Sequence, residues 1–298
     1  IIKEELIEIR DKFGDDRKTK IVAAEGEIDI DDLIKEEQTV IALTHFGYIK
    51  RMPIDTYRSQ KRGGKGITGI ATREEDFVKQ IFTASTHDTI LFFTNKGKLY
   101  KLRGYEVPEA GRTARGTAIV NLLSLDAGEK VSAVIPIQNF AEGKYLLMAT
   151  KNGLIKKTAL AEYNSARKTG LQGITLKEDD ELIAVRLTDG EDNVVLVTRN
   201  GMCITFDEKD VRPIGRVSQG VIGIRIDEDD EVIGMESIIS GGKATLLAIT
   251  ENGFGKRTEL DEYRVQIRGG KGVITYKVTQ KTGKLVGARI ATDDEDVM

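Results

Sequence analysis

The chain has 298 residues, 40% of them hydrophobic and 31% charged, which is enough for about two domains and excludes a mostly disordered chain. One cysteine and two histidines exclude a disulfide and are too few for a structural zinc site, so Cys203, His45 and His87 are expected to be structural or surface residues. The apolar runs are too short to span a membrane and the acidic N-terminal segment lacks a signal-peptide pattern, which predicts a cytoplasmic protein in a reducing compartment.

The net charge of −3 is unevenly distributed along the chain. Residues 1–37 carry 7 basic and 13 acidic side chains, and residues 293–296 are all acidic. The remaining residues, 38–292, carry 38 basic and 31 acidic side chains. The net charge therefore does not exclude a polyanionic partner, because the location of the charges matters more than their sum.

The N-terminal residues predict an amphipathic helix. Ile2, Leu6, Ile9 and Phe13 follow one another at spacings of 4, 3 and 4 residues, which places them on one helical face. We expect this helix, within residues 1–20, to dock onto something upstream. Residues 21–37 are expected to form an acidic, irregular connector.

Two series of glycines mark an internal repeat. A short apolar run followed by a Thr-x-x-Gly turn occurs five times, at spacings of 50, 56, 48 and 52 residues. These turns end at Gly47, Gly97, Gly153, Gly201 and Gly253. A second series follows 19 or 20 residues later, at Gly66, Gly116, Gly173, Gly220 and Gly272. This register indicates five structural repeats, at approximately 38–87, 88–141, 142–190, 191–242 and 243–298.

Each repeat contains four short apolar runs. In the second repeat they are 90–93, 98–102, 117–123 and 131–137, and Gly, Asn and Asp bound them as they bound strands. Four strands per repeat predict an all-β fold, a propeller-like ring or spiral of about five to six four-stranded blades. Since Val297 and Met298 begin another unit, we expect the sequence to end where a sixth blade starts. A β-solenoid and tandem small sandwiches are the alternatives.

Between the second and third apolar runs of each repeat lies a loop rich in glycine and basic residues. In the first repeat it reads Tyr57-Arg58-Ser59-Gln60-Lys61-Arg62-Gly63-Gly64-Lys65-Gly66, with four positive charges and no negative one. Glycines allow successive backbone N–H groups to turn toward an anion. Arginine can donate two hydrogen bonds to phosphate oxygens, and lysine acts as a point charge. The loop is therefore a candidate phosphate site.

The equivalent loops of the other repeats carry further basic residues and no acidic ones. They supply Arg112, Arg115, Arg167, Lys168, Arg212, Arg216, Arg264, Arg268 and Lys271. For any single loop, a glycine turn with solvated Lys and Arg is the simpler interpretation. Five loops in register instead predict a continuous basic belt around the blades, which suits bent duplex DNA held through its phosphates with little sequence preference.

Gln60, Lys61, Arg62, Gly63, Gly64, Lys65 and Gly66 resemble, at all seven positions, the GyrA box of the bacterial DNA gyrase A family. The fifth repeat matches six of these positions and departs at Ile267. The resemblance covers nearly the whole chain and implies the C-terminal β-pinwheel of a type IIA DNA topoisomerase, a propeller variant whose blades exchange strands. It also implies that the first 20 residues resemble the helix that leaves the gyrase core.

The resemblance further implies function and partners. Duplex DNA would wrap around the basic rim in a positive-handed crossing, which strand passage converts into negative supercoils, and the box would complete the wrap. The expected assembly is a heterotetramer of gyrase A and gyrase B subunits, with the isolated domain monomeric and no membrane involved. ATP and Mg are expected on other parts of the holoenzyme, so this segment would hold no cofactor and no metal and would be non-catalytic. The family usually has six blades, which leaves a closed ring and an open spiral as alternatives here.

Two other functions remain open at this point. One is the equivalent domain of topoisomerase IV, against which the complete box argues. The other is a protein-docking propeller, resembling chromatin-associated exchange factors, whose belt would meet an acidic protein. Tyr48, Tyr100 and Tyr145 lie in or beside strand runs and are expected to pack. The acidic groups 179–181 and 227–231 recur at one turn of each unit and are expected to be solvated.

Overall fold

The computed structural model describes residues 2–16, 18–20, 30–54, 76–238 and 244–292, in two compact units, 1–35 and 36–298. The first unit contains α1 (Ile2–Phe13) and α2 (Ile30–Leu33). Helix α1 confirms the predicted N-terminal helix, and its apolar side chains are exposed. Helix α2 lies within the segment 21–37, which we expected to be irregular. The carboxylates of Asp31 and Asp32 in its first turn interact favourably with the positive end of the helix dipole. No helix of the described residues is long and apolar enough to cross a membrane.

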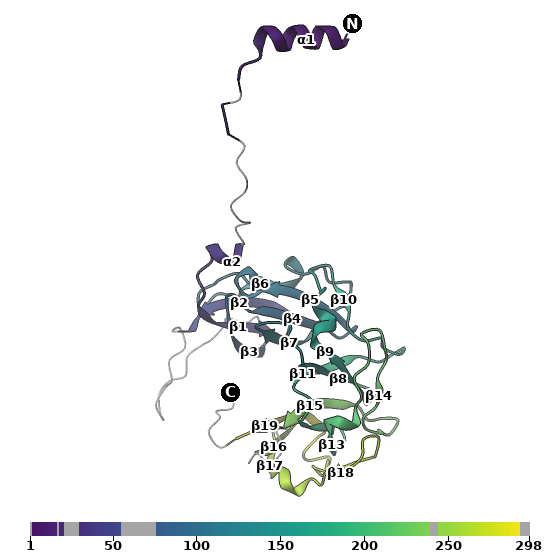
Figure 1. Ribbon diagram of the computed structural model, residues 1–298. Coiled ribbons are helices and arrows are strands. Elements are labelled where there is room, and N and C mark those ends of the chain that lie inside the picture. The colour runs from purple at the N-terminus through teal and green to yellow at the C-terminus, as the bar shows by residue number, and fades with distance from the viewer. Residues whose placement is uncertain (1, 17, 21–29, 55–75, 239–243, 293–298) are drawn as a thin grey trace. The chain divides into compact units, whose positions relative to one another are not determined.

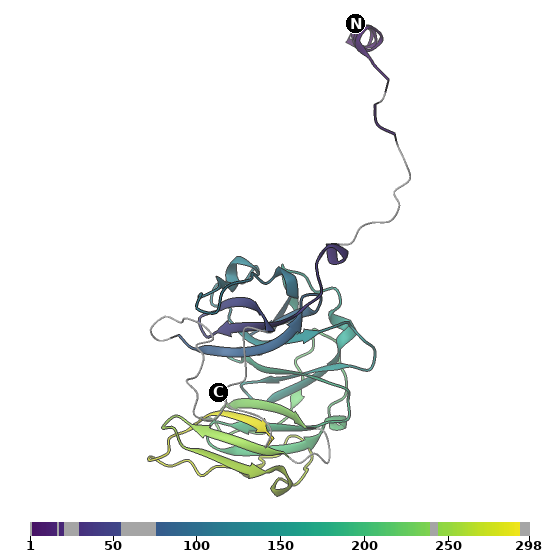
Figure 2. The same cartoon turned by 90° about the vertical axis from the view of Figure 1, so that its left-hand side faces the viewer.

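The second unit consists of five antiparallel sheets that follow one another in chain order (Figures 1 and 2). From the inner edge outward, blade one contains β3 (Val78–Ser85), β1 (Gln38–Thr44), β2 (Tyr48–Pro53) and β6 (Thr117–Ala118). In the same order, blade two contains β7 (Val131–Ile137), β4 (Thr89–Thr94), β5 (Lys98–Arg103) and β10 (Leu171–Gln172). Blade three contains β11 (Leu182–Thr188), β8 (Tyr145–Thr150), β9 (Leu154–Ala159) and β14 (Val221–Ile222). Blade four contains β15 (Val232–Ile238), β12 (Asn193–Thr198), β13 (Met202–Asp207) and β18 (Val273–Ile274), and blade five contains β19 (Leu285–Ala291), β16 (Thr245–Thr250) and β17 (Gly255–Glu259).

The outer strand of each four-stranded blade comes from the following repeat. Strand β6 of the second repeat pairs with β2 of the first, and β10, β14 and β18 pair in the same way with β5, β9 and β13. This exchange is the one that the pinwheel resemblance implies. The prediction of a full third strand at 117–123 was wrong, because pairing stops after Ala118. A 3-10 turn, η3 (Ile119–Asn121), follows and buries Ile119 between blades.

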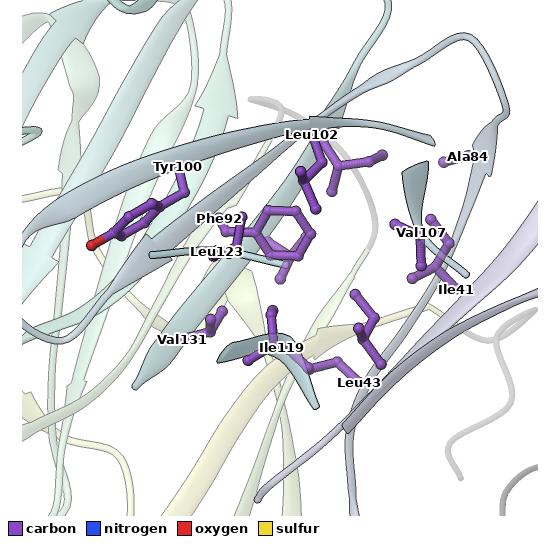
Figure 3. Close-up of a cluster of buried hydrophobic side chains, with 13 residues drawn as sticks. Ile41, Leu43, Ala84, Phe92, Tyr100, Leu102, Val107, Ile119, Leu123 and Val131 are labelled. Carbon is purple, nitrogen blue, oxygen red and sulfur yellow. The ribbon is translucent and has the colours of Figure 1, made fainter. Parts of the chain in front are cut away.

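The apolar runs are buried because each blade packs against its neighbours. All six residues of β4 are buried, with Phe92 facing blade one and Phe93 facing blade three. Figure 3 shows Phe92, Ile41, Leu43 and Ile119 converging in the cluster between the first two blades. Burying one large apolar side chain contributes about 1.5–3 kcal/mol, so these interfaces hold successive blades together. The continuous apolar runs were correctly interpreted as strands covered on both faces.

The inner strands of all five blades line one cavity of about 1100 Å³. Arg186 on β11 donates to both carboxylate oxygens of Glu236 on β15, at 3.0 and 2.8 Å, and Arg289 on β19 donates to Glu236 at 3.0 Å. A common cavity and shared outer strands establish a propeller and exclude the solenoid and tandem-sandwich alternatives.

The acidic groups between repeats are not all solvated as predicted. Asp180 is buried, and its Oδ1 accepts hydrogen bonds from the backbone N–H groups of Asn152 and Glu181, both at 2.9 Å. The Oδ1 atom of Asp230 likewise accepts hydrogen bonds from the backbone N–H groups of Asn200 and Glu231, both at 2.9 Å. These carboxylates satisfy N–H groups of the Thr-x-x-Gly turns of the third and fourth repeats, so they have a structural role there.

Candidate nucleic-acid interface

The glycine-rich basic loops of the second to fifth repeats lie along the outer edges of the blades (Figure 1). We call these segments of the second to fifth repeats the rim loops, namely residues 111–116, 166–173, 212–220 and 264–272. Each follows the second strand of its own repeat and ends at the outer strand of the preceding blade. On the way it runs beside the second strand of that preceding blade, through the parallel bridges Lys157–Pro213 and Thr205–Val265 in two cases. Equivalent rim loops therefore occupy equivalent positions on successive blades.

Glycine is required where a rim loop meets the strand beneath it. Gly116 has φ +90°, and a Cβ there would lie 2.5 Å from the carbonyl oxygen of Ile49. Gly272 has φ +78°, and its Cβ would lie 2.3 Å from the carbonyl oxygen of Cys203. A side chain would face both a left-handed backbone and a direct clash. Gly116, Gly220 and Gly272 of the second series thus mark the line along which loops and blades join.

The structure places the predicted basic side chains of the described rim loops at this outer edge. Seven are exposed, namely Arg112, Arg115, Arg167, Lys168, Arg212, Arg264 and Lys271. Arg216 and Arg268 are half-buried. Arg58 and the box residues Gln60, Lys61, Arg62, Gly63, Gly64, Lys65 and Gly66 lie outside the described residues.

Several of these side chains contact acceptors on the protein. The Lys168 ammonium lies 2.6 Å from the carboxylate of Glu106, and that of Lys271 lies 3.1 Å from Asp227. Exposed pairs of this kind contribute about 0–1 kcal/mol, so they compete weakly with a phosphate. Arg268 differs, because its guanidinium donates to the carbonyl oxygens of Asp210 and Ile222 at 2.9 and 3.0 Å.

Two buried lysines lie beneath rim loops of the next repeat. Lys50 on β2 is fully buried, and its Nζ donates to the carbonyl oxygens of Gly111, Arg112 and Ala114 at 3.1, 2.5 and 3.1 Å. Burial lowers the pKa of Lys50. The ammonium therefore has three acceptors, all from one rim loop.

Lys156 on β9 is the equivalent residue two blades further on, but its acceptors come from two rim loops, that of its own repeat and that of the next. It is fully buried, and its Nζ donates to the carbonyl oxygens of Gly173, at 2.8 Å, and of Arg216. Burial, together with the positive charge of Arg216, lowers the pKa of Lys156 to about 8, while Glu162 acts in the opposite direction.

Sequence reasoning missed both lysines. The available signal was a lysine inside an apolar run at the third position after the turn glycine, which recurs at Lys50, Lys156 and Lys256. The same position is Tyr100 in the second repeat and Ile204 in the fourth, and both side chains are fully buried. A buried lysine in a strand needs acceptors from elsewhere, which the sequence does not reveal.

The other predicted side chains have structural roles. Tyr100 is buried and donates from its hydroxyl to Glu129 at 2.9 Å, while Tyr48 and Tyr145 are half-buried beneath Arg115 and Lys157. Cys203 is buried, and burial raises its pKa to about 12. The described residues contain no group of three or more His, Cys, Asp or Glu suited to a metal ion.

What the rim offers chemically is a series of guanidinium and ammonium groups on a glycine-rich backbone. Such groups bind phosphate oxygens through charge-assisted hydrogen bonds. The described part of the rim consists of loops and two-residue strands, and nothing in it resembles the helix or β-ribbon that reads a major groove. The arrangement favours contacts to a nucleic-acid backbone.

Comparison with known proteins agrees with this arrangement. The family described as "DNA gyrase C-terminal domain, beta-propeller" matches residues 38–85, 88–138, 144–189, 192–239 and 244–292. The chain is 56% identical to the DNA gyrase A subunit of Clostridium acetobutylicum and 46% identical to that of Staphylococcus aureus. All of the chain is covered in both cases, but it spans only 36% and 34% of these relatives.

Solved structures show the same fold. The C-terminal domain of DNA topoisomerase IV matches with a TM-score of 0.72 and 30% identity, covering 87% of this chain and 79% of that one. A DNA gyrase A C-terminal domain matches with a TM-score of 0.72 and 27% identity, covering 87% and 84%. The matched family segments begin and end close to the five repeats and together include most of the chain. This chain belongs to the family of DNA gyrase C-terminal domains.

Proposed function

We propose that this domain wraps duplex DNA around the outer edges of its blades. The observation that carries the proposal is that basic side chains of four described rim loops, each from a different repeat, lie at equivalent positions on successive blades. Duplex DNA carries one negative charge per about 1.7 Å of its axis, so phosphates are available at every blade along its path.

Bending the duplex requires contacts that are spread over several blades. A smooth bend of 40–90° over 20–30 base pairs costs about 1–6 kcal/mol. Phosphate contacts at the rim loops and at the box Gln60–Gly66 would offset this cost. Because such contacts carry no base information, recognition would depend on charge and deformability, with little sequence preference.

Within a gyrase, the wrapped segment would be presented to the upstream core of the A subunit for strand passage. The B subunit would hydrolyse ATP, with its Mg, so that the heterotetramer introduces negative supercoils in the bacterial cytoplasm. The present segment would be non-catalytic, and its contribution would be the handedness of the DNA crossing. The box in the first repeat would complete the wrap.

Topological footprinting tests the proposal directly. The chain is bound to nicked circular DNA, ligase seals the nick, and the linking number is measured after the protein is removed. We expect a positive shift, which the triple substitution K61A/R62A/K65A should abolish. The matched control K96A/K130A/K177A removes three exposed lysines outside the rim loops and should preserve the shift. No shift with the unsubstituted chain would defeat the proposal.

Salt dependence separates wrapping from the docking of an acidic protein. Neutralising 6–10 phosphates should lower the DNA affinity about 10³- to 10⁵-fold between 50 and 200 mM salt. A flat response would instead favour a docking propeller. The complete box Gln60–Gly66 favours gyrase over the topoisomerase IV domain, which shares the fold.

A further inference from the structure

We propose that Lys50 and Lys156 are positioning residues of the DNA interface, each holding a rim loop of the next repeat through the backbone carbonyl of that loop's arginine. This inference rests on the proposed DNA binding. The carbonyl oxygen of Arg112 accepts a hydrogen bond from Lys50, and that of Arg216 accepts one from Lys156. The two arginines occupy the same position, four residues before the second-series glycine.

The ammonium of Lys50 has as many N–H donors as the loop 111–116 offers it carbonyl oxygens. A lysine has three N–H donors and no acceptor, and Lys50 meets three carbonyl oxygens of one short loop. Without the carbonyls, the ammonium would be an uncompensated buried charge. The carbonyl oxygen of Gly111 also accepts from the backbone N–H of Ala114 at 3.0 Å, so Lys50 binds a turn that the loop closes on itself.

Anchoring the backbone from below leaves the side chain of Arg112 free to face outward, whereas that of Arg216 is half-buried. Arg112 is exposed, although its own carbonyl oxygen lies 2.5 Å from the buried Lys50. A loop that is ordered before DNA arrives loses less conformational entropy on binding. The buried ammonium also adds positive potential immediately behind the surface that would meet a phosphate.

Lys156 makes the anchoring sensitive to pH. The charged groups that face it are Arg216 on the rim loop and Glu162 on η4 (Leu160–Tyr163), and the hydroxyl of Tyr163 shares the carbonyl of Gly173. Burial and Arg216 lower the pKa of Lys156 to about 8. Its ammonium is therefore lost near this pH, at which arginine and exposed lysine side chains remain charged.

The test compares K50M and K156M with K79M in the full chain. Lys79 is a suitable control because its Nζ also donates to a carbonyl, that of Val131 at 2.7 Å, but it lies at the central cavity. Hydrogen exchange without DNA should accelerate in residues 111–116 for K50M and in 212–220 for K156M, and in neither segment for K79M. The double variant K50M/K156M should bind a fluorescent duplex about tenfold more weakly at fixed salt, because two loops are no longer preorganised.

A pH profile separates positioning from a purely structural role. At constant salt, the duplex affinity of the unsubstituted chain should fall as the pH rises through 8, whereas that of K156M should stay flat. If K156M does not fold, K50M decides through its loop exchange and duplex affinity, read against K79M. Unchanged loop exchange and affinity in the folded variants overturn the proposal. A flat salt response of the unsubstituted chain would instead refute DNA binding itself.

Discussion

Lys50 and Lys156 bind the arginine carbonyls of the second- and fourth-repeat rim loops. The third-repeat loop instead packs on Tyr100, with its last residue, Gly173, also bound by Lys156, and the fifth-repeat loop lies over Ile204. The third-repeat loop packs Gly170, with φ +89°, against the ring of Tyr100, where a Cβ would lie 2.8 Å from Cε1. The fifth-repeat loop turns the guanidinium of Arg268 back onto the carbonyls of Asp210 and Ile222. The same loop path is thus stabilised in two ways.

This difference is clearest between the loop over Lys50 and the loop over Ile204. Where Lys50 binds the loop carbonyls, the side chain of Arg112 is exposed. Where Ile204 replaces the lysine, the equivalent arginine, Arg268, itself binds backbone carbonyls and is half-buried. Arg216, whose carbonyl oxygen is bound by Lys156, is half-buried like Arg268, so the exposed arginine accompanies Lys50 and not Lys156.

The largest expected change in stability comes from the glycine that both classes of loop place against a strand carbonyl. Gly116→Ala, over Lys50, and Gly272→Ala, over Ile204, should each lower the free energy of unfolding by about 2–4 kcal/mol, because the new Cβ meets both a positive φ and a strand carbonyl. Denaturant unfolding monitored by circular dichroism measures the loss.

Gly215→Ala is the matched control for these substitutions. A Cβ at Gly215 would meet nothing within 4 Å, and its backbone is not left-handed. The substitution should be neutral or slightly stabilising. A loss confined to Gly116→Ala would show that the two classes of loop do not share the glycine contact.

Much of the fold could be predicted because its signals are local. The Thr-x-x-Gly turns and the apolar runs fix the repeats and the first, second and fourth strands. The exchange of the outer strand followed only from the family resemblance, because its pairing joins β6 to β2 of another repeat. Carbonyls that bind Lys50 lie 61 to 64 residues along the chain, so no local pattern indicates that an ammonium is buried there.

The stability that Lys156 contributes should depend on pH. The pKa of Lys156 is lowered in the folded state, so between about pH 8 and 10 the unfolded chain binds more protons and stability rises with pH. The stability of the unsubstituted chain relative to K156M should therefore increase over this range, while its DNA affinity falls. Denaturant unfolding of both chains from pH 7 to 10 provides the measurement.

Subtracting the unfolding free energy of K156M from that of the unsubstituted chain removes the contributions of other titrating groups. Burial raises the pKa of Cys203 to about 12, so its contribution to stability is lost as the pH rises above the value of a free thiol. Cys203 is present in both chains and its contribution cancels. A relative stability that is independent of pH would show that Lys156 keeps its ordinary pKa.

The smallest expected effect separates the two arginines. Arg112→Ala removes an exposed charge and should reduce the slope of log affinity against log salt by about 0.9, with loop exchange unchanged. Arg268→Ala removes the donor to the carbonyls of Asp210 and Ile222, so it should accelerate hydrogen exchange in residues 264–272 and change the slope less. Equal slopes in the two variants would mean that Arg268 leaves its carbonyls to meet DNA, and that the fifth-repeat loop resembles the lysine-anchored loops once DNA is bound.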